Sequence, residues 1–130
     1  MNKKLELAAK YRENGMNCAQ AVALPFCDEL GIDKKTVMMG LEGFGAGMGN
    51  RNQICGALSG AVFIASLKTS DGNLAKPSSK AKTYSVTGNI CEEFKNRCGA
   101  INCKDILNNG KPLISCAECV NIGIELAEKA

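Results

Sequence analysis

The chain has 130 residues, enough for one domain with one hydrophobic core, and 45% of them are hydrophobic. The net charge is only +3 and the lysines are scattered, which argues against a nucleic-acid-binding face. The sequence contains no histidine, which excludes histidine ligands, histidine bases and covalent haem attached through C-x-x-C-H.

Eight cysteines are the unusual feature of this composition. The first fifteen residues hold no long apolar run. The longest apolar stretch, residues 54–67, is too short and too interrupted by Gly and Ser to enter a membrane as a spanning helix. We therefore predict a cytoplasmic protein whose thiols stay reduced unless they perform redox work or bind a metal. A secreted, disulfide-stapled domain is the competing interpretation. It fits less well, because this chain can build a helical core without disulfides.

Hydrophobic periodicity predicts helices throughout the chain and no strand of useful length. A first helix ends at Asn14-Gly15, and a second begins after the N-cap residue Asn17 and is kinked at Pro25. The predicted longer helices cover residues 2–13, 18 to about 30, 34 to about 42, about 54 to 67, about 78 to 97 and about 115 to 128, and a short helix covers 103–107. We interpret this pattern as an all-α, single-domain bundle of about five to six helices over residues 1–130.

A glycine-rich segment, residues 43–50, precedes the fourth predicted helix. Its alternating glycines exclude a regular helix and permit close backbone approach. It matches neither the dinucleotide-binding fingerprint nor the Walker A loop. Small residues around Gly60 also allow a second helix or a cofactor to lie close to the following helix. We expect backbone N–H groups near Cys55 to stabilise charge on sulfur, and the candidate cofactor-binding residues are Gly43, Gly45, Gly47, Gly49 and Gly56.

Four cysteines are each expected at the first turn of a helix. The helix dipole and unpaired N–H groups stabilise a thiolate at this position and lower its pKa. Thiolate is the form that attacks disulfides and binds metals. The alternative interpretation is four small apolar side chains at ordinary helix starts. The four residues are Cys18, Cys55, Cys103 and Cys116.

Cys116 and Cys119 form a C-x-x-C pair at a helix start, where both side chains lie on one face and can form a disulfide or hold a metal. A thioredoxin assignment lacks its βαβ context. Cys55 is the best candidate for a single reactive thiolate, so the candidate catalytic residues are Cys55, Cys116 and Cys119. Cys27 and Cys91 lie among apolar residues and are interpreted as core thiols.

These motifs together resemble the C_GCAxxG_C_C family of redox-active proteins over about residues 4–126. The resemblance rests on Asn17-Cys18-Ala19-Gln20-Ala21-Val22, on the glycine-rich run into Cys55-Gly56-Ala57-x-x-Gly60-Ala61, on Phe94, Gly99, Cys103 and Leu107, and on Cys116 with Val120. It implies that the four defining cysteines are the four helix-start residues. The family is distantly similar to the split-Soret cytochromes c, which are helical, dimeric haem proteins. This similarity and the small-residue helix suggest a homodimer, but covalent haem is not expected here.

Three hypotheses follow from the residues. The first is a redox site that performs electron transfer or thiol–disulfide chemistry with an unknown redox partner, either directly or through an iron–sulfur cluster. The second is a non-enzymatic module that holds zinc or another soft metal. In both, the expected metal ligands are Cys18, Cys55, Cys103 and Cys116. The third is a structural helical module with inert thiols. A small-molecule or haem pocket against the small-residue helix is a weaker fourth alternative.

Overall fold

The computed structural model describes residues 2–130, and its regular elements are all helical. The all-α prediction is therefore confirmed for the described residues, but the expected five to six helices are too few. The eight α-helices are α1 (Asn2–Glu13), α2 (Cys18–Ala23), α3 (Cys27–Leu30), α4 (Lys34–Gly40), α5 (Gly56–Thr69), α6 (Lys80–Cys98), α7 (Cys103–Leu107) and α8 (Cys116–Lys129).

The single helix predicted over 18–30 is divided at Pro25, which accounts for part of the larger number. A 3-10 turn, Leu24–Phe26, separates α2 from α3 at this residue, because proline cannot donate a backbone hydrogen bond. Helix α4 also ends earlier than the predicted end at about residue 42, since the chain leaves the helix at Gly40 and forms a separate 3-10 turn over Glu42–Phe44.

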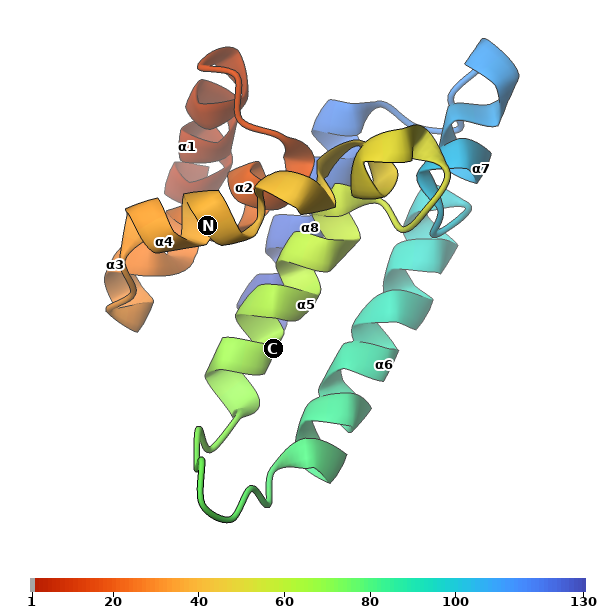
Figure 1. The fold of residues 1–130 in the computed structure, drawn as a ribbon. Coiled ribbons are helices and arrows are strands. Elements are labelled where there is room, and N and C mark those ends of the chain that lie inside the picture. Colours follow the sequence, from red (N-terminus) through yellow and green to blue (C-terminus); the bar gives the residue numbers. More distant parts are fainter. Residues whose placement is uncertain (1) are drawn as a thin grey trace.

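Helix α5 is the centre of the bundle, and α2, α6 and α8 pack against it (Figure 1). The side of α5 that meets α2 carries almost no side-chain bulk. A Cβ added to Gly60 would lie 2.7 Å from the carbonyl oxygen of Ala19 in α2. In the same way, a Cβ on Gly123 of α8 would lie 2.8 Å from the carbonyl oxygen of Ala57. The small residues of α5 thus accommodate neighbouring helices along its length.

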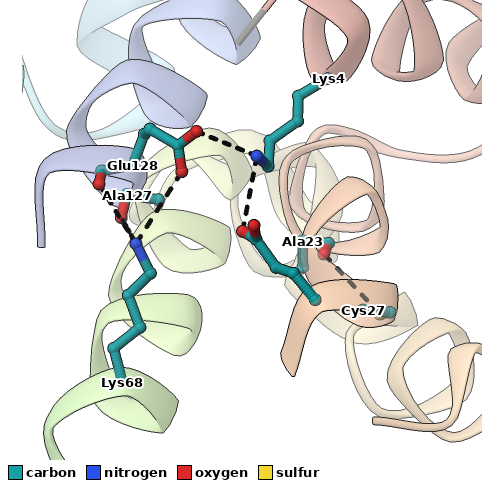
Figure 2. A network of polar contacts seen from close by, with 7 residues as sticks. Lys4, Ala23, Cys27, Lys68, Ala127 and Glu128 are labelled. Atoms are coloured by element: carbon teal, nitrogen blue, oxygen red, sulfur yellow. Dashed lines mark hydrogen bonds and ion pairs between the residues drawn. The ribbon is translucent and has the colours of Figure 1, made fainter. Parts of the chain in front are cut away.

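Charged side chains tie the two ends of the chain to α5 (Figure 2). Lys4 Nζ lies 2.9 Å from Glu128 Oε1 at the end of α8. Lys68 of α5 donates hydrogen bonds to the carbonyl oxygens of Ala127, at 2.8 Å, and Glu128, at 3.2 Å. Both ammonium groups also lie near the buried ring of Phe26, at 5.0 and 5.4 Å from its centroid. This network holds α1, α5 and α8 together at the end of the bundle where the two termini of the described chain meet.

The Lys4–Glu128 pair makes the free energy of unfolding depend on pH in the acid range. The hydrogen bond from Lys4 lowers the pKa of Glu128 below its ordinary value of 4.5. Its stabilisation is therefore fully present above that value and is lost as the pH falls through the lower, folded-state pKa. We expect Glu128→Gln to reduce the free energy of unfolding at neutral pH by about 0.5 kcal/mol, because solvent still reaches this partly buried pair and screens it. The difference from the unmodified chain should vanish in acid. Urea unfolding at neutral and acid pH checks this, and a pH-independent difference would contradict it.

The glycine-rich segment, α7 and the start of α8 gather at the opposite end of α5 (Figure 1). All four helix-start cysteines belong to elements that begin at this end. Among the described residues, the structure contains no helix that is long and apolar enough to cross a membrane.

Candidate functional site

Two of the four helix-start cysteines are held side by side by a short backbone ladder. Ile54 and Asn102 form an isolated antiparallel bridge. The N–H of Cys55 donates to the carbonyl of Ile101 at 2.9 Å, and the N–H of Cys103 donates to the carbonyl of Gln53 at 2.7 Å. These bonds fix the start of α5 against the start of α7. They involve only one residue pair, which is why no strand pattern is visible in the sequence.

The glycine-rich segment presses against this ladder. Gly47 has a φ of +57°, and a Cβ on it would lie 2.5 Å from the Cβ of Cys103. Gly56 lies against Cys18, since its Cβ would meet Cys18 Cβ at 3.3 Å. Glycine at position 47 is therefore required by its close packing on Cys103, whereas a Cβ on Gly56 would make a tight contact that also includes the carbonyl oxygen of Phe44, at 3.0 Å.

Helix caps position the other two cysteines. Asn17 and Gln20 form a reciprocal capping box in front of α2, which places Cys18 as its first residue. The Asn17 amide also donates to the carbonyl of Glu42 at 2.9 Å and so ties α2 to the segment after α4. Ser115 caps α8 by accepting from the N–H of Glu118 and places Cys116 as its first residue. The helix-start prediction is confirmed for three cysteines, and Cys55 is the N-cap residue of α5 rather than a residue inside it.

One small cavity brings these cysteines together. It has a volume of about 90 Å³ and is lined by five of the eight cysteines and by mostly apolar neighbours. The lining residues are Cys18, Ala46, Gly47, Cys55, Gly56, Cys103, Ile106, Leu107, Pro112, Ile114, Cys116 and Cys119. Four helix starts that are far apart in the sequence therefore converge at one place. The cavity includes every cysteine that we selected as a candidate catalytic residue or metal ligand.

Not every candidate glycine belongs to the cavity. Gly47 and Gly56 line it, whereas Gly43, Gly45 and Gly49 are absent from its lining. The positions of Gly43 and Gly49 have open space where a Cβ would be. Only the middle of the glycine-rich segment, Ala46 and Gly47, therefore lies at the cavity.

Thiol contacts inside the site differ from the pairing expected from C-x-x-C spacing. The Cys119 thiol donates a hydrogen bond to the Cys55 sulfur, and the Cys18 thiol donates one to Cys116. All eight cysteines are free thiols. The expected Cys116–Cys119 disulfide stays a prediction, and the thiol of Cys119 is hydrogen-bonded to Cys55 instead.

Cys55 is the most acidic thiol of the site. Its pKa is lowered to about 7, first by the hydrogen bond from Cys119 and then, against the effect of burial, by the N–H groups of Ala57 and Leu58 at the start of α5. The N-terminus of the helix thus stabilises this thiolate as expected.

The expectation of a lowered pKa is wrong for two of the other helix-start cysteines. Burial raises the pKa of Cys18 to about 12, with further contributions from the nearby Cys55 and Cys116 sulfurs. Burial likewise raises the pKa of Cys103, and Cys55 and Cys116 add to the effect. Gathering several thiols around an apolar cavity makes each additional negative charge more costly. Burial and the neighbouring sulfurs therefore raise the pKa values of these two thiols more than the helix dipole lowers them.

This asymmetry predicts that Cys55 reacts first with a small alkylating agent. Its alkylation rate should rise with pH up to about 7 and then level off, because the thiolate fraction saturates above the pKa. The rate at Cys18 should keep rising well above that pH. Iodoacetamide labelling read by peptide mass spectrometry measures both profiles. A Cys55 rate that continues to rise into alkaline solution would contradict the assignment. Replacing Cys119 with alanine should move the Cys55 midpoint upward.

The donor set of the cavity suits a soft metal, because thiolates are the ligands that zinc and iron–sulfur clusters prefer. Within residues 2–130, however, no group of three or more Cys, Asp or Glu side chains stands close enough to hold a single metal ion. A tetrahedral zinc ion with Zn–S bonds of about 2.3 Å requires its sulfurs about 3.8 Å apart. The four cysteines therefore fit a metal in their chemistry, whereas binding a single ion would require them to move closer together.

Some site residues carry no functional signal in the sequence. Ile106, Pro112 and Ile114 line the cavity, yet they read as ordinary core and turn residues. Cys98, the last residue of α6, is only 2% exposed and lies within hydrogen-bonding reach of Cys119. Its position beside the glycine that ends α6 gives no indication of this contact.

The two cysteines predicted to be core thiols differ in burial. Cys27 is buried as predicted and donates a hydrogen bond to the carbonyl of Ala23 (Figure 2), whereas Cys91 is only half-buried.

A comparison with protein families matches most of the chain. The family model described as "Putative redox-active protein (C_GCAxxG_C_C)" matches residues 16–130, a range that includes the whole cavity lining. Searches of curated proteins and of solved structures found no match to this chain.

Proposed function

Because the chain belongs to the C_GCAxxG_C_C family of redox-active proteins, we propose that four of its cysteines act together as one redox centre. The centre performs electron transfer or thiol–disulfide chemistry with a redox partner. Its members are Cys18, Cys55, Cys103 and Cys116. The observation that carries the proposal is their convergence, with Cys119, on one cavity of about 90 Å³.

Cys55 is the residue that opens the chemistry in the direct thiol form of this proposal. A nucleophilic thiol must be ionised near neutral pH, and the lowered pKa of Cys55 meets this requirement. Cys119 contacts Cys55 and supplies a second thiol to complete a disulfide. The apolar lining keeps bulk water away from the reacting sulfurs, and such exclusion protects a thiolate intermediate from side reactions.

An iron–sulfur cluster held by the same four cysteines is a second candidate. When bound, it would supply one-electron chemistry, and its ligands would be Cys18, Cys55, Cys103 and Cys116. A cluster distributes its thiolates over several iron atoms and so tolerates wider sulfur separations than a single zinc ion. The lack of a compact ligand group in the described chain therefore favours a cluster over a mononuclear zinc module.

We also propose that the protein works in the cytoplasm, where thiols stay reduced. The support is that all eight cysteines are free, including the pairs that contact one another.

Counting reversible thiols tests the proposal. The reduced full-length chain is oxidised with a small disulfide, re-reduced, and its thiols are counted at each stage. We expect the four-cysteine centre to lose and regain thiols reversibly, and each of Cys18→Ser, Cys55→Ser, Cys103→Ser and Cys116→Ser to reduce the exchange or abolish a metal-based chromophore. Cys91→Ser is the matched control, because Cys91 is absent from the cavity lining, and it should behave like the unmodified chain. Equal behaviour of all five variants would overturn the proposal.

A further inference from the structure

Three buried thiols extend from the cavity into the core. Cys55 is 8% exposed at the cavity, and Cys119 and Cys98 are each 2% exposed. The Cys119 thiol contacts the sulfurs of both Cys55 and Cys98. Cys98 does not line the cavity. Cys119 therefore lies between a thiol that a cavity ligand can reach and one that it cannot.

The packing of α6 against α8 fixes this arrangement. Cys98 is the last residue of α6, and Cys119 lies in the first turns of α8. The neighbouring Arg97 forms an ion pair with Glu125 of α8 at 2.6 Å, which anchors the end of α6 to that helix. A Cβ on Gly99, the residue after Cys98, would lie 3.0 Å from a methyl group of Leu113, so the chain beyond α6 is also closely packed. Cys98 is thus held beside Cys119 by contacts on both sides.

We propose that Cys55, Cys119 and Cys98 form a thiol relay that moves a disulfide from the cavity into the core. The relay rests on the proposed function, because it needs Cys55 to react with a disulfide substrate. It deepens that function by assigning a role to Cys98 and by placing Cys119 between Cys98 and Cys55. Its substrate class is a small organic disulfide, which is also the oxidant.

The steps balance as disulfide exchanges. The Cys55 thiolate attacks one sulfur of the substrate, forms a mixed disulfide and expels the first substrate thiolate. Cys119 gives up its proton to that thiolate, attacks the Cys55 sulfur and expels the second substrate thiolate. Cys98 then gives up its proton to the second substrate thiolate, attacks the Cys119 sulfur and releases Cys55 as the thiolate with which the sequence began. The substrate gains two electrons and becomes two thiols, and Cys98 and Cys119 end as a disulfide.

This relay would return Cys55 to its reduced state while the oxidised pair is shielded from solvent. A Cys55–Cys119 disulfide joins two sulfurs that both line the cavity, whereas in a Cys98–Cys119 disulfide only Cys119 lines it, and both residues are 2% exposed. The relay therefore moves one end of the disulfide out of the cavity lining and into the core.

Disulfide mapping of the unmodified chain tests the relay. The anaerobically reduced, full-length protein is treated with one equivalent of oxidised glutathione, quenched with acid, alkylated and mapped by mass spectrometry. We expect the internal disulfide to link Cys98 to Cys119, with Cys55 recovered as an alkylated thiol. An internal disulfide that forms while Cys98 stays alkylated would overturn the relay and leave the proposed function intact. If neither an internal disulfide nor a Cys55–glutathione adduct forms, the direct thiol form of the proposed function fails as well.

Three variants separate the steps. With Cys98→Ser, the disulfide should stop at Cys55–Cys119. With Cys119→Ser, the Cys55–glutathione adduct should accumulate. Cys91→Ser, on the same helix as Cys98, should give the same map as the unmodified chain. If a serine variant fails to fold, the alanine variant replaces it, and the map of the unmodified chain still decides the proposal.

Discussion

Replacing Gly60 with alanine is expected to destabilise the fold by about 2 kcal/mol, although alanine is the better helix former. The new Cβ would lie 2.7 Å from the carbonyl oxygen of Ala19 and 3.0 Å from the Cβ of Val22, so α2 and α5 would have to separate. Overpacking typically costs about 1–3 kcal/mol, and a clash with a backbone oxygen belongs at the upper end of that range. It therefore exceeds the roughly 1 kcal/mol gained in helix propensity by about 2 kcal/mol. The free energy of unfolding measured in urea checks the value.

Gly88 supplies the matched control. It lies inside α6, and a Cβ on it meets nothing within 4 Å. Gly88→Ala should therefore stabilise the chain by about 0.5–1 kcal/mol through helix propensity alone. The same substitution in two helices is thus expected to have opposite signs. A stabilising Gly60→Ala would contradict the close packing of α2 on α5.

Replacing Gly47 with alanine is expected to disrupt the cysteine site with only a modest effect on the bundle. The added Cβ would lie 2.5 Å from the Cβ of Cys103, and that side chain must move away from the cavity. Cys103 would lose the burial that raises its pKa, so its alkylation rate at neutral pH should increase severalfold. Peptide mapping after iodoacetamide treatment measures this rate directly.

Gly49→Ala separates this contact from backbone strain. Gly49 also has a positive φ, +84°, but a Cβ on it would enter open space. Both variants therefore carry the cost of alanine in the left-handed region, and only Gly47→Ala displaces Cys103. A similar rise in Cys103 alkylation in the two variants would show that strain in the segment, rather than contact with Cys103, controls the site.

The sequence predicts the helical fold and the helix-start positions of Cys18 and Cys116 well because both depend on local signals. Asn17 and Ser115 are N-cap residues, and the cap alone fixes the helix start that places Cys18 and Cys116. The glycine-rich run before Cys55 similarly indicates a close approach of backbone. Local patterns of this kind are visible without knowledge of the tertiary structure.

Thiol pairing and acidity could not be predicted in the same way. Cys119 contacts Cys55 rather than following its C-x-x-C spacing to Cys116, because α5 packs directly against the start of α8. The pKa of Cys18 is raised first by burial and then by the nearby Cys55 and Cys116 sulfurs, and these effects exceed that of the helix dipole. The role of Cys98 depends on the packing of α6 on α8. All three properties arise from contacts between residues far apart in the sequence.

The most direct test of the central claim is anaerobic purification of the full-length chain, followed by metal analysis, a visible absorption spectrum and a thiol count on one sample. We predict a redox-active centre at the four cysteines. The sample should contain either stoichiometric iron, with a charge-transfer band that bleaches on reduction, or metal-free thiols that convert reversibly to disulfides. Either signal should be lost when Cys55 is replaced by serine and kept in Cys91→Ser. Stoichiometric zinc without colour, or a sample with neither metal nor reversible thiols, would contradict the account.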